Sequence, residues 1–162
     1  MDERPLAYLI TWTCYGARLH GDARGAVDGQ HNQPGAAFVP PNALREQFER
    51  GRMAHEPFLL TKPRRAVVRH AIEETAGINA WRVLCSNVRT NHVHVVLETL
   101  AEPAKVRNSL KSWCTRRMRE ASVAARDARV WAEGGSARFL WTREAIERAS
   151  RYVMFEQGPD LD

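Results

Sequence analysis

The sequence predicts an α+β protein with a ferredoxin-like, split βαβ core and an extra helix behind it. Three observations predict this class. The chain of 162 residues is 44% hydrophobic and 27% charged, a composition typical of one globular domain. Its apolar residues alternate in some segments and recur every three or four residues in others, in the order β-α-β-β-α-β. A last helical segment follows the fourth strand.

The first expected element is a strand over Leu6–Thr13, where aromatic, β-branched and aliphatic residues follow one another. Glycine and proline then recur across residues 16–41, which excludes a helix or a long strand there. A short amphipathic helix is expected over Asn42–Arg50. We therefore interpret 1–162 as a single domain whose residues 16–60 form a long irregular insertion between the first strand and the first core helix.

The first core helix is expected over Thr61–Ala76, with Thr61 able to cap it and Pro63 in its first turn. Two alternating segments follow, Ala80–Asn87 and His92–Thr99, separated by four residues. This pattern predicts a β-hairpin.

The remaining elements are a long helix, a short strand and the extra helix. Apolar residues at helical spacing predict the long helix from Pro103 to about Ala125. The segment Ala137–Trp141 reads as the fourth strand. The last helix is expected from Thr142 to about Glu156, because glycine and proline follow shortly after.

The cysteine content, the apolar runs and the net charge limit the classes of function that the protein can have. The three cysteines Cys14, Cys85 and Cys114 are odd in number and lack zinc spacing, which favours a reduced, cytoplasmic protein. The apolar run near the N-terminus is too short for a secretory signal or a membrane span, so no membrane role is indicated. The formal net charge of +5 fits a polyanionic partner such as nucleic acid.

The most informative string is NHVHVV, residues 91–96. Side chains two residues apart point to the same face of a strand, so His92 and His94 stand together while Val93 and Val95 face the opposite layer. Two imidazoles on one face can bind one metal ion. The alternative is that both are ordinary surface or hydrogen-bonded strand residues.

A nucleophile and a third ligand are available on the last helix. Tyr152 and Glu156 are four residues apart and therefore share a face. A tyrosine hydroxyl beside a metal-bound carboxylate is a candidate nucleophile. Gln157 competes for the ligand role if Gly158 lets the final turn unwind. The alternative is that Tyr152 is a core residue of the helix and Glu156 a solvated one.

Basic residues gather on the long helix. Between Ala104 and Val130 there are eight basic and two acidic side chains. Four residues at four-residue spacing form a stripe along which a phosphate backbone could lie: Arg107, Lys111, Thr115 and Arg119. Arg64, Arg65 and Arg69 of the first core helix could extend this patch. The alternative is a solvated helix face without a ligand.

Several of these strings together resemble the single-tyrosine HUH transposases, which are the insertion-sequence 200/605-type enzymes and their relatives associated with repetitive extragenic palindromes. The matching parts are NHVHVVLE, the basic helix with Lys111 and Ser112, RFLW, and RYVMFEQG. GARLHGDARG, residues 16–25, also resembles a loop of the palindrome-associated branch. The resemblance covers about Leu6 to Gln157.

This resemblance implies an HUH fold, a Mg²⁺ or Mn²⁺ ion, and single-stranded DNA folded into a hairpin as substrate. His92 and His94 match the metal-binding pair, and Tyr152 matches the nucleophile that forms a 5′-phosphotyrosine link. Glu156 occupies the family position of the third ligand, with Gln157 next to it, so both are candidates. Family members also tend to be homodimers.

Two other functions compete with a strand-cleaving and strand-joining transposase. One is a non-catalytic protein that binds DNA hairpins and descends from such an enzyme. The other is a metal-dependent hydrolase or oxygenase with two histidines and one carboxylate as ligands. The presence of His92, His94 and Tyr152 together favours the transposase.

Overall fold

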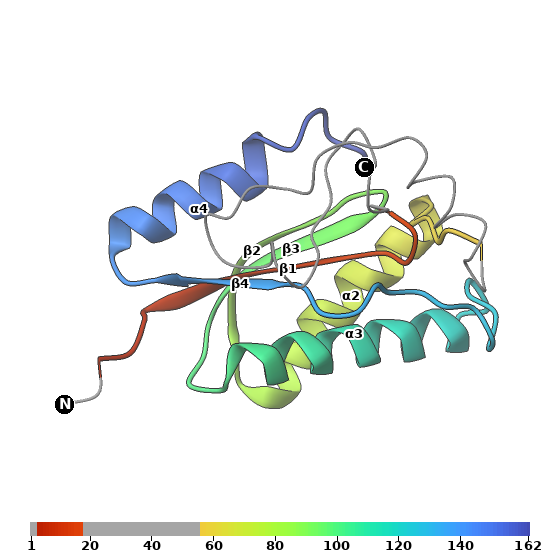
Figure 1. Ribbon diagram of the computed structural model, residues 1–162, viewed down its shortest axis with the longest axis horizontal. Coiled ribbons are helices and arrows are strands. Elements are labelled where there is room, and N and C mark those ends of the chain that lie inside the picture. Colours follow the sequence, from red (N-terminus) through yellow and green to blue (C-terminus); the bar gives the residue numbers. More distant parts are fainter. Residues whose placement is uncertain (1–2, 18–55) are drawn as a thin grey trace, which may run out of the picture.

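In the part of the chain that the structure describes, four strands form one antiparallel sheet in the order β2-β3-β1-β4 (Figure 1). The computed structural model describes residues 3–17 and 56–162. Along these residues the elements are β1 (Ala7–Thr13), α2 (Lys62–Asn79), β2 (Arg82–Val88), β3 (His92–Glu98), α3 (Pro103–Glu120), β4 (Ser136–Leu140) and α4 (Arg143–Phe155). The predicted order of the core elements is therefore confirmed.

The topology is that of the split βαβ fold. β3 is antiparallel to both β1 and β2, so β1 and β2 run in the same direction with β3 between them. In the chain, α2 lies between β1 and β2, and α3 lies between β3 and β4. The ferredoxin-like fold class is thus confirmed, and α4 follows the last strand of this core.

Helices cover both faces of the sheet. α2 and α3 lie on one face and α4 on the other (Figure 1). Alternate residues of β3 divide between the two layers: Val95 is buried in the core on the α2 and α3 side, whereas Val96 packs with Val153 of α4. His92 and His94 alternate with Val95 and so share the face opposite that residue, as predicted, and this is the face that α4 covers.

α3 is shorter than predicted. The expected end near Ala125 is wrong because Ser122 has a left-handed backbone with φ of 58°. The N–H of Ser122 donates to the Arg119 carbonyl, and the N–H of Val123 donates to the Met118 carbonyl. These two bonds form a Schellman motif, which satisfies the last carbonyls of a helix and turns the chain away.

α2 is longer than predicted. Its expected end at Ala76 is wrong because Gly77 continues the helix, and the left-handed residue that ends it is Ala80, with φ of 55°. The N–H of Trp81 donates to the Ala76 carbonyl at 2.9 Å. Thr61 is the N-cap residue as expected, although its side chain makes no capping hydrogen bond.

The predicted insertion over 16–60 coincides largely with residues outside the described part of the chain, and so does the helix expected over 42–50. Its two ends belong to the core. Phe58 and Leu60 are buried, and their N–H groups donate to the carbonyls of Tyr15 and Thr90. These contacts join the end of the insertion to the segment after β1 and to the turn between β2 and β3.

All three cysteines are free thiols. Cys14 and Cys114 are buried, and burial raises the pKa of each thiol to about 12. Within the described residues, none of the helices combines the length and the apolar character needed to cross a membrane.

Candidate metal and nucleophile site

One row of side chains on the α4 face of the sheet is polar. The strand register places Asn87 of β2, His94 of β3 and Thr11 of β1 next to one another across the sheet. Paired residues of antiparallel strands point to the same face, so all three lie beneath α4. The row lies in the half of the sheet that is nearest the β2–β3 turn.

The two histidines stand side by side in this half of the sheet. Their ring centroids are 4.9 Å apart, and His94 is only 5% exposed. Nδ1 of His94 is 2.7 Å from Oγ1 of Thr11, and Nδ1 of His92 is 2.8 Å from Oδ1 of Asn91. These bonds orient both rings so that Nε2 is the atom presented to the end of α4.

Gln157 brings a third polar group to the histidines. Its Oε1 lies 3.3 Å from Nε2 of His92 and 3.1 Å from Nε2 of His94. Its Nε2 donates to the carbonyl of Tyr152 at 3.1 Å. Glu156 is the exposed C-cap residue of α4, and no hydrogen bond or ion pair joins its carboxylate to either histidine in the described part of the chain. The structure thus brings Gln157 to the histidine pair and leaves Glu156 outside it.

Tyr152 lies in the last turn of α4 with its ring against His94. The ring centroids are 5.6 Å apart and the ring planes are inclined by 71°. Asn87 anchors this turn to the sheet by donating from Nδ2 to the Val153 carbonyl at 2.8 Å. With 42% of its surface exposed, Tyr152 borders both the imidazole pair and solvent. One chain therefore brings the phenol and the histidines together.

The donor set suits a divalent cation. Both ring nitrogens of His92 face amide oxygens, those of Asn91 and Gln157, although a neutral imidazole carries only one N–H. Neighbouring ligands of an octahedral ion with bonds of about 2.1 Å lie about 3 Å apart, close to the separation of Gln157 Oε1 from the two Nε2 atoms. The described residues contain no group of three His, Cys, Asp or Glu side chains that could hold a metal ion, so any third protein ligand beside the two histidines would have to be an amide such as that of Gln157.

The predicted basic stripe lies along the side of α3 that faces the segment leading into β4. The Lys111 ammonium donates to the carbonyls of Ala132 and Gly134 at 2.8 and 3.0 Å. Burial lowers the pKa of Lys111, and the charge of Arg107 adds to this effect. Nε of Arg107 is buried and has no hydrogen-bond partner among the described residues. Half of the stripe is therefore packed against its own chain.

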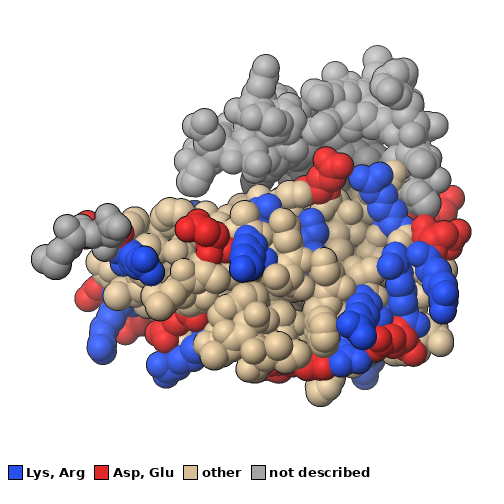
Figure 2. Space-filling model, turned by 90° about the horizontal axis from the view of Figure 1, so that it is seen from below, with Lys and Arg blue, Asp and Glu red and all other residues tan. Residues whose placement is uncertain are grey.

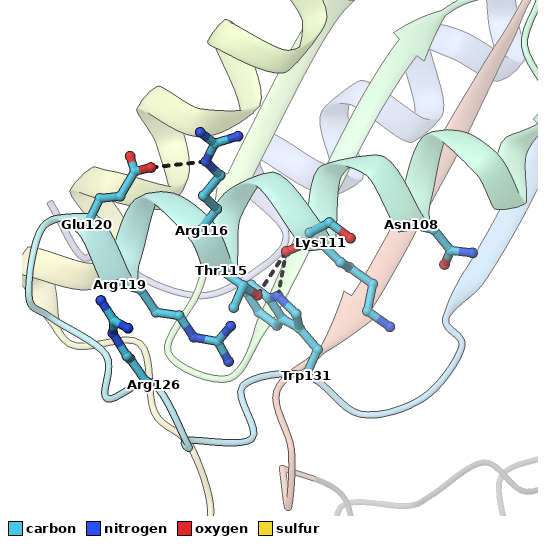
Figure 3. A pocket seen from close by; sticks show the side chains of 9 residues that line it. Asn108, Lys111, Thr115, Arg116, Arg119, Glu120, Arg126 and Trp131 are labelled. Carbon is cyan, nitrogen blue, oxygen red and sulfur yellow. Dashed lines mark hydrogen bonds and ion pairs between the residues drawn. The ribbon is translucent and has the colours of Figure 1, made fainter.

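Further along α3 the surface is hollowed (Figure 3). The hollow has a volume of about 740 Å³ and contains Arg119 and Arg126 on the same side of the helix, beside Trp131. Arg116 at its rim pairs with Glu120 at 3.0 Å, whereas the described residues supply no ion-pair partner for Arg119 or Arg126. Figure 2 shows basic side chains gathered toward one end of this face of the molecule, with some acidic ones among them. The hollow is a candidate site for an anion.

The basic residues of α2 do not extend this patch, although α2 and α3 are neighbours. The Arg64 guanidinium donates to the carbonyls of Leu59 and Val123. Arg65 and Arg69 form ion pairs with Asp162. All three guanidinium groups are therefore bound by the protein itself.

Several residues of this site were not predicted from the sequence. Thr11 and Asn91 orient the histidines, Asn87 anchors α4, and Arg126 completes the hollow beside α3. A weak signal was available for Thr11, a polar residue within an apolar strand, and for Asn91, which directly precedes the first histidine. Arg126 lies beyond the end of α3, so its place beside Arg119 is set by the loop that follows the helix and not by helical spacing.

Comparisons with known proteins bear on the fold. No protein-family model matches the chain, and no curated protein matches it in sequence. A solved structure of a REP-associated tyrosine transposase bound to a REP hairpin is similar, with a TM-score of 0.51 and 11% identity over 93% of this chain. The chain spans 65% of that protein. A candidate transposase from Deinococcus radiodurans R1 gives a TM-score of 0.48 with 13% identity, over 96% of this chain and 93% of the other. The first of these likenesses shows the fold alone: the chain shares the α+β fold of the REP-associated tyrosine transposase.

Proposed function

We propose that this protein is a transposase-like enzyme that cleaves and rejoins single-stranded DNA through a tyrosine nucleophile and a bound Mg²⁺ or Mn²⁺ ion. The observation that carries the proposal is the convergence of His92 Nε2, His94 Nε2 and Gln157 Oε1 beside the ring of Tyr152. These atoms come from β3, α4 and the segment after it, and the tyrosine transposase-like fold brings them to one end of the sheet.

The proposed roles follow from where each side chain lies. His92, His94 and Gln157 hold the ion, while Thr11 and Asn91 fix the ring orientations through Nδ1. When bound, a divalent ion withdraws charge from a phosphate and orients it for in-line attack. Tyr152, half-exposed next to His94, can meet a DNA strand that approaches from solvent.

The proposed reaction is a transesterification. Oη of Tyr152 forms a bond to the phosphorus of a phosphodiester, and its proton passes to solvent. The bond from phosphorus to the 3′ oxygen breaks, and that oxygen takes up a proton to give a free 3′-hydroxyl. The DNA remains joined to Tyr152 as a 5′-phosphotyrosine, and attack by a 3′-hydroxyl in the reverse direction rejoins a strand.

A DNA hairpin is the proposed substrate. The solved transposase of similar fold is bound to a REP hairpin. In the present chain, Arg119 and Arg126 line a hollow on the α3 face, on the opposite side of the sheet from Tyr152. We propose that this hollow binds backbone phosphates of the duplex stem while an unpaired flank reaches Tyr152.

The test is an adduct assay. Labelled hairpin DNA with single-stranded flanks is incubated with the protein and Mg²⁺ or Mn²⁺, and a covalent complex that survives denaturation is expected. Hairpin binding without an adduct under either metal would favour the non-catalytic alternative. A hydrolase or oxygenase with two histidines and one carboxylate would require Glu156 at the histidines, where Gln157 lies instead. Because one chain assembles the site, the proposed chemistry does not depend on the homodimer, which stays a prediction.

Gln157 and Glu156 are matched candidates for the third ligand. We expect Gln157→Ala to weaken Mn²⁺ binding by about tenfold or more and to lower cleavage in proportion, because one of three protein ligands is lost. Glu156→Ala should leave Mn²⁺ affinity unchanged. Isothermal titration calorimetry with Mn²⁺ measures both variants. The opposite order of effects would assign the ligand role to Glu156.

The hollow beside α3 can be tested by salt dependence. Arg119→Gln and Arg126→Gln should each weaken hairpin binding and reduce the slope of log K against log salt by about 1, since each removes one phosphate contact. Arg82→Gln is the control, because Arg82 is an exposed residue at the start of β2 that pairs with Glu98. Unchanged slopes in both hollow variants would place the DNA elsewhere on the protein.

A further inference from the structure

The segment after α4 links the α4 layer to the start of α2 at the end of the sheet that carries the β2–β3 turn. At Gln157 its amide contacts the histidines beneath α4. At Asp162 it forms ion pairs with arginines of α2. Between these points it passes the β2–β3 turn, where Nη2 of Arg89 donates to the Pro159 carbonyl at 3.0 Å. Residues 158–162, named here the C-terminal strap, are therefore attached at two places beyond Gln157.

Both attachment points are buried arginines. Among the described residues only four polar side chains belong to buried residues, and two of them, Arg65 at 8% exposure and Arg89 at 9%, bind the strap. Arg65 donates from Nε and Nη2 to the two carboxylate oxygens of Asp162 at 2.8 and 3.0 Å. Burying a guanidinium is costly unless it is paired, so the strap and these arginines stabilise each other.

Asp162 keeps its charge over the working range of pH. Hydrogen bonds from Arg65 and Arg69 hold the pKa of its carboxyl well below the usual range. A lowered carboxyl pKa means that the contribution of this pair to stability is complete above about pH 4 and is lost only as the pH falls through the lower, folded-state value. At neutral pH the ion pairs of Asp162 with Arg65 and Arg69 therefore remain formed.

The attachments fix Gln157 from both sides. On its N-terminal side, Asn87 holds the last turn of α4 through the Val153 carbonyl. On its C-terminal side, Gly158 has φ of 87° and leads directly to the carbonyl that Arg89 binds. Gln157 lies beyond the end of α4, so these contacts, together with the hydrogen bond from its own Nε2 to the Tyr152 carbonyl, set its position.

We propose that the C-terminal strap positions Gln157 against His92 and His94, with Arg65 and Arg89 as positioning residues that act through Asp162 and Pro159. The inference rests on the proposed function, because it assigns the support of one proposed metal ligand. It adds that the proposed metal site on the α4 face depends on an ion pair with α2, on the far side of the β2–β3 turn.

The test is a coupling measurement on the full chain with Mn²⁺ as the probe. Asp162→Asn should weaken Mn²⁺ binding by about tenfold, the size found for residues that orient metal ligands. In a Gln157→Ala background the same substitution should have no further effect on Mn²⁺ affinity, because the group it positions is gone. Arg82→Gln, which removes a different ion pair of the sheet, should leave Mn²⁺ affinity unchanged.

A purely structural role predicts a different result. Asp162→Asn would then lower the unfolding temperature without changing Mn²⁺ affinity, or would weaken binding equally with and without Gln157, and either result would overturn the proposal. Arg65→Lys is a second variant that keeps the charge but loses the two-point contact, and it should reproduce part of the loss in Mn²⁺ affinity.

Failure of the proposed function is recognised separately. If the protein does not bind Mn²⁺, or if His94→Ala does not weaken that binding, the proposed metal site is wrong. The strap proposal is then tested by the imidazole NMR signals of His92 and His94, which do not require a bound ion. Asp162→Asn should shift these signals in the same direction as Gln157→Ala, and unshifted signals would overturn the strap proposal.

Discussion

Tyr152→Phe is expected to abolish the covalent DNA adduct, lowering its rate of formation by at least about 10³-fold, because the substitution removes the only atom that attacks phosphorus in the proposed reaction. The aromatic ring that packs against His94 remains, so the fold and the ion site should be preserved. Hairpin affinity should stay within about twofold of the unmodified protein, since the proposed phosphate contacts lie on the other face of the sheet.

Tyr8→Phe is the matched control for this variant. Tyr8 is buried on the opposite face of the sheet, where its ring contacts Phe139 at 5.3 Å between centroids. Its variant should form the adduct at the normal rate. Denaturing gels with labelled hairpin report adduct formation, and fluorescence anisotropy reports binding. An adduct formed by the Tyr152→Phe protein would assign the nucleophile to another residue.

The second large effect is expected at Gly135, where the chain enters β4. A Cβ at this position would lie 2.5 Å from the Thr11 carbonyl oxygen and 2.7 Å from Cδ of Arg107, and φ is 140°. The backbone of β1 cannot yield as a flexible side chain would. We expect Gly135→Ala to lower the free energy of unfolding by about 3 kcal/mol, from the sum of close contact and backbone strain.

The neighbouring glycine is a control for backbone strain alone. Gly134 has φ of 71°, and a Cβ there would meet nothing within 4 Å. Gly134→Ala should therefore cost only about 1 kcal/mol. Urea denaturation of both variants measures the difference. Equal losses of unfolding free energy in the two variants would show that the Gly135→Ala protein relieves the close contact with Thr11 at no energetic cost.

Gly135 also links the packing of β1 to the candidate metal site. Its tight contact is with the backbone of Thr11, whose hydroxyl lies 2.7 Å from Nδ1 of His94. Any shift of β1 that accommodates an added Cβ moves this hydroxyl relative to the imidazole. The Gly135→Ala protein should therefore lose Mn²⁺ affinity as well as stability, whereas Gly134→Ala should keep its affinity.

Local patterns predicted the strands and the orientation of the histidines well. The alternation in β3 placed Val95 in the larger core and His94 on the opposite face, because side chains of a strand alternate whatever the rest of the chain does. The helix ends were less predictable. Ser122 and Ala80 end α3 and α2 in left-handed conformations, although glycine is the usual residue there, and α2 continues through Gly77 beyond its expected end at Ala76.

The candidate site was predictable only in part. Spacing selected His92, His94 and Tyr152, and the structure brings all three together. Spacing along a helix favoured Glu156 over Gln157, because four residues make one turn. The helix ends at Phe155, however, and beyond it the position of each side chain depends on contacts with Arg89 and the rest of the fold.

By itself the sequence determined the fold class, the order of the core elements and the face of the sheet on which the histidines lie, since each depends on periodicities of two or 3.6 residues within one segment. The tertiary structure alone decided that Gln157 meets the histidines, that Thr11 orients His94, and that Arg65 and Arg89 hold the strap behind them. These contacts join residues up to 97 positions apart in the chain, and no local pattern carries information about such pairs.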